Sequence, residues 1–179
     1  MVSFRLLPWM TAAEADWDAL YAAELPRIYN YFRYRVGSAA DAEDLTARTF
    51  EKAWRARGRY RRDLAGFSTW LFTIARHVAI DHYRARREEL PLEAAQAVPS
   101  PARTPEQDAS LGEDARRLAR LLDALPARER ELVALKYGAG LTNRAIARAT
   151  ELSESNVGTS LQRTIERLRD GWNAGPAGD

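Results

Sequence analysis

The 179-residue chain contains no cysteine and only two histidines, His77 and His82. Without cysteine the chain has neither disulfides nor thiolate metal sites, and two histidines alone do not complete a zinc site. No apolar run approaches the ~20 residues that a membrane span requires. The first ten residues hold a short apolar patch and are soon followed by acidic residues, unlike a signal peptide. We therefore expect a cytoplasmic protein with no metal, no cofactor and no membrane insertion.

The residue sets that catalysis uses are also missing. The sequence shows no Gly-rich phosphate loop, no Ser/His/Asp set and no cluster of metal ligands. We therefore predict that the protein is not an enzyme.

The formal net charge is only +2, but the charge is unevenly distributed. Residues 55–87 hold nine arginines against two aspartates, a local net charge of +7. Residues 88–114 hold seven acids against one arginine, a local net charge of −6. A basic block next to an acidic one suits a polyanion on one surface and a different partner on another.

Four of the eight prolines fall between residues 91 and 107, a stretch with no periodic apolar face. Prolines this dense break helices and favour extended chain. The sequence thus predicts an N-terminal domain over 13–88, a flexible acidic linker over 89–109 and a C-terminal domain over 110–171. The tail, 172–179, has a composition typical of disorder.

Both domains have the pattern of helices, with no alternating runs and no hairpin signal. In the first domain, Gly37 ends one helix and Ser38 or Asp41 caps the next. In the second, we expect helices near 110–124, 127–138, 142–149 and 153–170, with Pro126 in the first turn of the second of these. The fold class is therefore all-α: two small helical domains joined by an acidic, proline-rich linker.

The long helix predicted over 67–87 has two different sides. The inward side is apolar and consists of Phe67, Trp70, Leu71, Ile74, Ala75 and Val78. The opposite side carries Thr69, Thr73, Arg76, His77, Ile80, Tyr83, Arg84 and Arg87, and the loop before the helix adds Arg57, Arg59, Tyr60, Arg61 and Arg62. Hydroxyls, guanidiniums and an aromatic ring suit phosphate contact and stacking on an unpaired base. The alternative, a merely solvated face, would more usually mix both signs of charge.

The helix predicted over 41–57 also has a distinct charged face. The residues expected to point inward are Ala42, Leu45, Thr49, Phe50 and Ala53, and those sharing the charged face are Asp44, Arg48, Glu51 and Arg55. Ion pairs at this spacing stabilise a helix by only ~0.2–0.5 kcal/mol each, and spacing alone favours that simple explanation. A protein-docking face is the other interpretation.

Residues 142–169 have the pattern of two short helices joined by a tight turn, the shape of a helix-turn-helix. The buried stripe of the second helix would be Val157, Leu161, Ile165 and Leu168, and the outward side Asn156, Thr159, Ser160, Arg163 and Arg167. Asn and Arg make bidentate contacts to adenine and guanine edges. Ser153 is a plausible N-cap for this helix. The pattern favours a helix that enters the major groove of DNA over an amphipathic helix in an ordinary bundle.

Together these segments resemble, in order along nearly the whole chain, an extracytoplasmic-function (group IV) sigma factor, the promoter-specificity subunit of bacterial RNA polymerase. Residues 41–54 are similar to the polymerase-docking helix of sigma region 2. Residues 67–87 are similar to the segment that melts and reads the −10 element, and residues 125–168 to sigma region 4, which reads the −35 element. The resemblance also implies that the acidic linker threads the polymerase cleft.

The resemblance assigns roles to individual residues. It implies polymerase contacts by Asp41, Asp44, Leu45, Arg48, Thr49, Phe50 and Glu51. It implies −10 contacts by Arg59, Arg61, Arg62, Thr69, Thr73, Arg76, His77, Ile80, Tyr83, Arg84 and Arg87. It implies −35 contacts by Arg144, Ser153, Ser155, Asn156, Thr159, Ser160, Arg163 and Arg167. The implied partners are core RNA polymerase, through its largest-subunit clamp coiled coil and its flap, promoter DNA, and an anti-sigma factor.

Two single residues and one short stretch depart from the family pattern. His77 stands where the family usually has Asn, and Glu151 where the helix-turn-helix turn usually has Gly, so this turn either avoids a positive φ or tolerates strain. Residues 157–160 read Val-Gly-Thr-Ser in place of the usual Val-Lys-Ser-Arg. Because two basic groups are lost, we expect weak −35 binding by the isolated C-terminal domain.

One alternative function stays open on sequence alone. Residues 125–168 also resemble the DNA-binding domain of LuxR-type regulators, which bind duplex DNA without core polymerase. That interpretation requires an N-terminal sensory or receiver domain, which the all-helical, arginine-rich first half does not supply.

Overall fold

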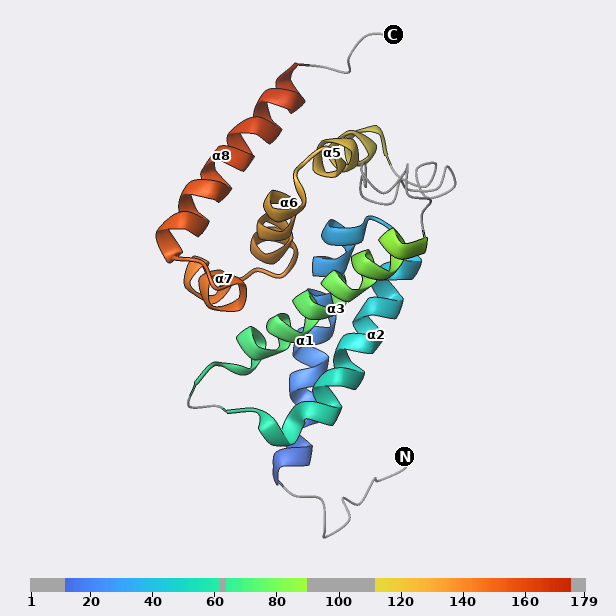
Figure 1. Ribbon diagram of the computed structural model, residues 1–179, viewed down its shortest axis with the longest axis vertical. Coiled ribbons are helices and arrows are strands. Elements are labelled where there is room, and N and C mark those ends of the chain that lie inside the picture. The colour runs from blue at the N-terminus through green and yellow to red at the C-terminus, as the bar shows by residue number, and fades with distance from the viewer. Residues whose placement is uncertain (1–11, 62–63, 90–111, 175–179) are drawn as a thin grey trace, which may run out of the picture.

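A computed structural model describes residues 12–61, 64–89 and 112–174 of the chain. These residues form helices and no strand (Figure 1). The first half contains α1 (Ala12–Val36), α2 (Ala39–Ala56), the 3-10 turn η1 (Arg57–Arg59) and α3 (Phe67–Glu89). The second half contains α5 (Glu113–Asp123), α6 (Ala127–Val133), the π-helical turn η2 (Ala134–Gly138), α7 (Asn143–Thr150) and α8 (Glu154–Asn173).

The first half is a bundle of α1, α2 and α3, which we call domain 2. Gly37 ends α1 in the left-handed region, with φ of 75°, and the Ser38 hydroxyl accepts from the Asp41 amide to cap α2. The inward side of α2 is buried as predicted, at Ala42, Leu45, Thr49, Phe50 and Ala53. The core that these side chains form with α1 and α3 fixes the orientation of the polar face of α2.

The second half, from α5 to α8, is called domain 4. The buried guanidinium of Arg130 in α6 donates from Nε to the carbonyl of Leu122 at 2.8 Å and from Nη2 to the carbonyl of Leu125 at 3.1 Å. The same guanidinium also donates to the carbonyl of Asp123, so it binds three carbonyls at the end of α5 and in the turn after it. Burial lowers the pKa of the Arg130 guanidinium.

The helix-turn-helix is formed by α7 and α8. Thr142 and Ser153 cap the two helices, each hydroxyl accepting from the amide three residues on. Between them Glu151 has φ of 59° and ψ of 28°, the left-handed conformation. The turn therefore keeps the geometry that glycine usually supplies, although a side chain is present.

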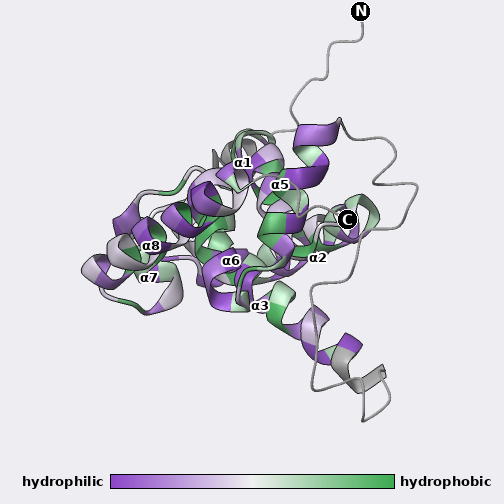
Figure 2. Ribbon diagram, turned by 90° about the horizontal axis from the view of Figure 1, so that it is seen from above, coloured by the Kyte–Doolittle hydropathy of each residue, from purple (hydrophilic) through white to green (hydrophobic). Residues whose placement is uncertain are grey.

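The two domains pack directly against each other, with α1 against η2 and α3 against α7. One continuous hydrophobic core includes Phe32 and Leu71 of domain 2 as well as Leu135 and Ile146 of domain 4. Figure 2 shows the hydrophobic residues gathered on the facing sides of the helices. Helical periodicity alone does not predict this packing, because it joins residues far apart in the sequence.

The packing buries more of α3 than the sequence predicts. Phe67, Leu71, Ala75 and Val78 are buried as expected, whereas Trp70 and Ile74 are only partly buried. Phe72 and Ala79 are also fully buried, although they lie outside the predicted apolar stripe. The one-sided prediction was wrong for Phe72 and Ala79, because α1, α2 and α7 all pack on α3 and Phe72 lies against Tyr31 of α1.

Helix positions agree with the predicted ranges to within a few residues, with one extension. The last helix continues to Asn173, two residues into the stretch predicted as a tail. The predicted linker lies almost wholly outside the described residues, as does the tail from residue 175 on.

We predict that Glu151→Gly stabilises the protein by about 0.5–1 kcal/mol, because a left-handed backbone strains any residue that carries a Cβ. Urea unfolding would measure the change. The matched control is Arg148→Gly at an exposed, right-handed position of α7, which should cost about 1 kcal/mol. A loss of stability for Glu151→Gly would contradict the strain argument.

Candidate nucleic-acid and polymerase interfaces

The polar face of α2 is exposed and internally paired. Arg48 Nε lies 2.8 Å from the Asp44 carboxylate, and Arg55 Nη2 lies 2.6 Å from the Glu51 carboxylate. All four side chains are more than half exposed, so these pairs contribute little to stability. We call Asp44, Arg48, Glu51 and Arg55 the α2 charged face. Exposed charges that stabilise little are available to contact another protein.

Three residues that the resemblance assigned to polymerase contact lie elsewhere. Leu45, Thr49 and Phe50 are between 0 and 6% exposed, and Thr49 donates its hydroxyl hydrogen to the Leu45 carbonyl. They are part of the domain 2 core and are unavailable to a partner in this conformation. Their assignment as contact residues is therefore corrected: they support α2 from beneath.

The N-terminal end of α2 is tied to α3. The Asp41 carboxylate accepts from Arg86 Nη1 at 3.1 Å, and both side chains are only partly exposed. His82 of α3 lies nearby, and burial lowers its pKa against the opposing effect of Asp41. Its buried Nε2 atom has no hydrogen-bond partner among the described residues. Asp41 is thus held in a contact between two helices, whereas Asp44 pairs with Arg48 within α2.

The arginine-rich loop before α3 rests on a cluster of aromatic rings. The Arg57 guanidinium lies 3.8 Å from the centre of the Trp54 ring, and Trp54 in turn packs against Trp17. The Tyr60 ring lies 5.0 Å from that of Trp70 and 5.6 Å from that of Phe67. The Tyr60 ring is thus packed edge-on against Phe67 and tilted against Trp70.

This aromatic cluster was not predicted from the sequence. The signal that could have found it is the density of Trp, Tyr and Phe at the two ends of the loop, in residues 54–70. The cluster fixes where the basic loop leaves the bundle, with Arg59 and Arg61 exposed on it.

The predicted DNA-contacting side of α3 divides into two stripes. His77 and Arg84 are exposed. The other stripe is only half exposed and consists of Thr69, Thr73, Arg76, Ile80 and Tyr83. The residues left for DNA in this conformation are therefore fewer than predicted. The side chains of Arg62 and Arg87 lie outside the described residues.

Two residues of the half-exposed stripe have partners within the protein. Arg76 Nε lies 3.1 Å from a carboxylate oxygen of Glu131 in domain 4. The Tyr83 hydroxyl donates to the Arg35 carbonyl at 2.5 Å, and the Arg35 guanidinium lies over the Tyr83 ring. In this conformation Tyr83 serves packing, so the prediction that it stacks on a base does not hold here.

The outward side of the helix-turn-helix is accessible. Val157 and Leu161 are buried beneath it, while Ile165 and Leu168 are partly buried. The outward side chains Ser155, Asn156, Thr159, Arg163 and Arg167 are exposed, whereas Ser160 is partly exposed and donates to Asn156 Oδ1. Ser153 is exposed too and is used as the N-cap of α8.

The basic residues of this surface differ in their pairing. Arg167 lies 2.6 Å from the Glu129 carboxylate, and Arg144 lies 3.7 Å from that of Glu154. Arg163 has no partner among the described residues. At Gly158 an added Cβ would meet nothing closer than 3.7 Å, so packing does not require glycine there. Of these three arginines, Arg163 is therefore the one that can contact DNA without first breaking an ion pair.

Other kinds of site receive no support from the described part of the chain. Within it, no group of three or more His, Cys, Asp or Glu side chains is placed to hold a metal ion. None of its helices is long and apolar enough to cross a bilayer.

Comparison with known proteins identifies both halves. Residues 20–89 match the family model of Sigma-70 region 2, and residues 115–168 match that of Sigma-70 region 4. The chain is 34% identical over 165 residues to the ECF RNA polymerase sigma factor BldN of Streptomyces coelicolor, covering 88% of this chain and 61% of BldN. It is 31% identical over 151 residues to the ECF sigma factor SigD of Mycobacterium tuberculosis, covering 81% of this chain and 71% of SigD.

The fold has been seen in solved structures. The sigma factor RpoE of Bartonella quintana, crystallised with the anti-sigma factor NepR, superposes with a TM-score of 0.73 over 90% of this chain and 99% of that one, at 22% identity. The two family models, together with the relatives that are 31–34% identical, show that the chain belongs to the ECF RNA polymerase sigma factor family. It spans about three fifths of the length of BldN.

We predict that the free energy of unfolding falls as the pH drops from 7.5 to 5.5, in part because of His82. Its pKa in the folded protein lies below the ~6.5 of an unfolded chain, so the unfolded state binds the proton first and gains stability as the pH falls. Urea unfolding at several pH values should show a flatter profile for His82→Gln. Identical slopes in the two proteins would rule out this contribution.

Proposed function

We propose that this protein binds core RNA polymerase and directs promoter-specific transcription initiation. The observation that carries the proposal is the presence of both sigma regions, in order, in a single chain. A LuxR-type regulator is not favoured, because the first half matches sigma region 2 and not a sensory domain. The protein would act in the cytoplasm, where polymerase and promoter meet, and by binding, with no chemical step of its own.

In this proposal the α2 charged face docks on the clamp coiled coil of the largest polymerase subunit. The exposure of this face supports the proposal. The Asp44–Arg48 and Glu51–Arg55 ion pairs lie on one face of α2, and because exposed ion pairs stabilise a protein little, these charges can pair with polymerase residues instead at a small cost in free energy. Region 4 would contact the polymerase flap. An anti-sigma factor that covers these surfaces stays a prediction from the family resemblance.

The −10 element would be read by α3 and by the loop anchored on the aromatic cluster. His77 and Arg84 are exposed on α3, and Arg59 and Arg61 are exposed on the loop. Guanidiniums bind phosphates, while the histidine ring can stack on or bond to a base. We include Arg76 in this set on condition that its pairing with Glu131 is released.

The −35 element would be read by α8 in the major groove. Asn156 is the side chain whose chemistry reads base edges, and Arg163, Arg144 and Arg167 would approach the phosphates. Since Arg144 and Arg167 are paired with acids, the gain from phosphate contact is offset by the loss of those pairs. This supports the expectation of weak −35 binding by domain 4 alone.

The central test is run-off transcription with purified core polymerase on a promoter library. We expect selective initiation only when the protein is present, and at least a tenfold loss with Asp44→Arg, which places a positive charge beside Arg48. Glu43→Arg is the matched control, because Glu43 is exposed on α2 but about a quarter turn away from the charged face. Equal losses in both variants would contradict docking through the α2 charged face.

The absence of core-dependent initiation, together with tight duplex binding by domain 4 alone, would instead favour the regulator interpretation.

A second prediction concerns salt. Replacing Arg163 with Ala should weaken binding to the promoter duplex and reduce the slope of log K against log salt by about 0.9 if the residue contacts one phosphate. Arg167→Ala should change binding less, because Arg167 must first leave Glu129. Fluorescence anisotropy from about 50 to 200 mM salt would measure both. A larger loss of DNA binding for Arg167→Ala than for Arg163→Ala would contradict this prediction.

A further inference from the structure

A groove lies between α1 and α2 on the surface of domain 2, beside the α2 charged face; we call it the α1–α2 groove. Figure 1 shows the two helices running side by side. The groove has a volume of about 430 Å³, within the ~300–1,000 Å³ of sites that bind a ligand. Its lining is mainly apolar and consists of Tyr21, Leu25, Pro26 and Tyr29 from α1 and Glu43, Thr46 and Ala47 from α2. The groove therefore has the size and the chemistry to hold a short apolar segment.

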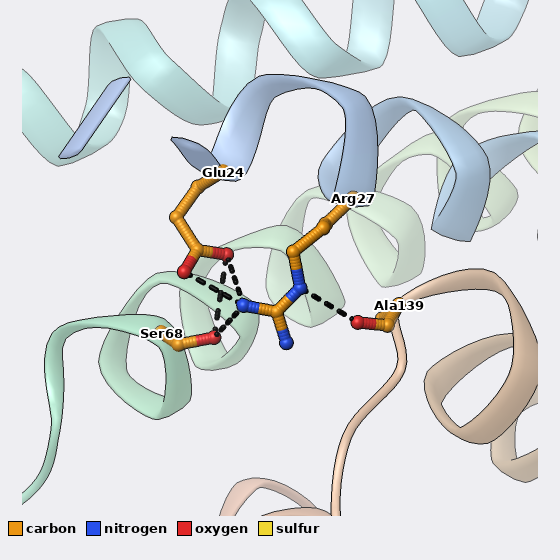
Figure 3. Close-up of polar contacts among 4 residues, drawn as sticks. All are labelled: Glu24, Arg27, Ser68 and Ala139. Atoms are coloured by element: carbon orange, nitrogen blue, oxygen red, sulfur yellow. Dashed lines mark hydrogen bonds and ion pairs between the residues drawn. The ribbon is translucent and has the colours of Figure 1, made fainter. Parts of the chain in front are cut away.

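Other sides of α1 are covered by the rest of the protein. The helix packs on α3 and on η2, and there Arg27 donates from Nε to the carbonyl of Ala139 at 2.8 Å (Figure 3). The Nη1 of Arg27 donates to both oxygens of Glu24, at 2.8 and 2.9 Å, and to the Ser68 hydroxyl at 3.0 Å. Tyr21, by contrast, is 40% exposed. The described residues thus leave the apolar stripe from Tyr21 to Tyr29 largely uncovered.

The proline in this stripe leaves a backbone acceptor beside the groove. A proline inside a helix has no N–H to donate to the carbonyl four residues earlier, and for Pro26 that carbonyl belongs to Ala22. Ala22 is exposed, so its carbonyl is accessible to an amide from another segment. An extended chain lying in the groove would bring such amides. The groove therefore offers a hydrogen-bond acceptor as well as apolar surface.

The sequence contains an apolar segment directly before α1. Seven of residues 1–11 are apolar and none is acidic. The larger apolar residues among them are Phe4, Leu6, Leu7, Trp9 and Met10. Pro8 favours extended chain at the residue before it. The composition of this segment therefore matches the lining of the groove.

The length of the segment also fits. Tyr21 lies nine positions after Ala12, ~14 Å along the helix, and Pro26 lies fourteen positions after it, ~21 Å along the helix. An extended chain covers ~3.3–3.6 Å per residue, so Leu6 can lie up to ~20 Å and Phe4 up to ~27 Å from Ala12. These distances exceed those along the helix by about 6 Å, which leaves chain for the reversal of direction.

We propose that residues 4–7 of the same chain fold back along α1 and lie in the α1–α2 groove. Leu6 and Leu7 then contact Tyr21. Phe4, which is further from α1 in the sequence, contacts Pro26. The segment removes apolar surface of domain 2 from water and thereby stabilises it. This inference does not depend on the proposed function in transcription.

The first test is a disulfide in the full-length protein, whose lack of cysteine makes an introduced pair specific. Ala47→Cys places a thiol at the groove, and Leu6→Cys places one in the segment, where Phe4 and Leu7 remain as anchors. We expect mild oxidation to give an intrachain disulfide, seen as a monomer whose mobility on a non-reducing gel changes. The control combines Leu6→Cys with Arg55→Cys, which is exposed on α2 outside the groove. Arg55 follows Trp54, which packs on Trp17 near the start of α1, so it is within reach of the segment. The control should form its disulfide at least tenfold more slowly.

The second test measures stability by urea unfolding. Phe4→Ser combined with Leu7→Ser should lower the midpoint, and so should Ala47→Arg, which places a charge in the groove. Because both changes disrupt the same contact, combining them should lower the midpoint no further than the larger of the two effects. The control Ala23→Arg is exposed on α1 outside the groove and should leave the midpoint unchanged. Circular dichroism would establish that each variant is folded.

Three results would overturn the proposal. One is an equal rate of disulfide formation in the Ala47→Cys and Arg55→Cys pairs. Another is an unchanged urea midpoint after Phe4→Ser with Leu7→Ser. A disulfide-linked dimer as the main product would be the third, because the groove would then hold the segment of a second copy.

Discussion

The arrangement of this protein depends on the pairing of Arg76 with Glu131 across the boundary between its two domains. Breaking a buried pair by removing one partner leaves an uncompensated charge and typically costs about 3–5 kcal/mol. Separating both partners into water together costs far less, because each regains hydration. Removing either residue alone is therefore costly, because the remaining charge is left unpaired in a largely buried place.

Two contacts near this ion pair also depend on particular residues at the domain boundary. Gly138 permits close approach of η2 to the α1 backbone, and Arg27 reaches one carbonyl of the turn. The apolar core, by contrast, runs through both domains without interruption. The packing of the two domains therefore combines apolar burial, which has no preferred direction, with a few directional polar contacts. The polar contacts determine which face of each domain lies against the other.

Much of the fold could be predicted because it is encoded locally. Periodicity placed the helices within a few residues, Ser38 and Ser153 were recognisable as caps, and the inward side of α2 followed from spacing alone. At Glu151 the turn keeps its left-handed backbone, which shows that the surrounding helices override the preference of one residue. These features depend on neighbours in the sequence, and a sequence displays them directly.

The candidate surfaces were predicted less completely, because exposure depends on residues far away in the chain. Periodicity correctly separated the polar side of α3 from the apolar side that contains Leu71, Ala75 and Val78. It could not show that Glu131, 55 residues later, lies against Arg76. Nor could it show that Tyr60 packs on Trp70. The sequence of a basic loop does not distinguish an aromatic ring that is exposed to a base from one that packs on the protein. Leu45, Thr49 and Phe50 were assigned to a partner by resemblance, although their own spacing had placed them inside.

The central proposal is that this chain binds core RNA polymerase through the α2 charged face. The most direct measurement is the affinity of the fluorescently labelled protein for purified core enzyme, compared between the parent and Asp44→Arg. We predict binding that saturates at one equivalent of core enzyme and is at least tenfold weaker for Asp44→Arg. A parent protein that does not bind core enzyme, or an Asp44→Arg variant that binds as tightly as the parent, would contradict the proposal.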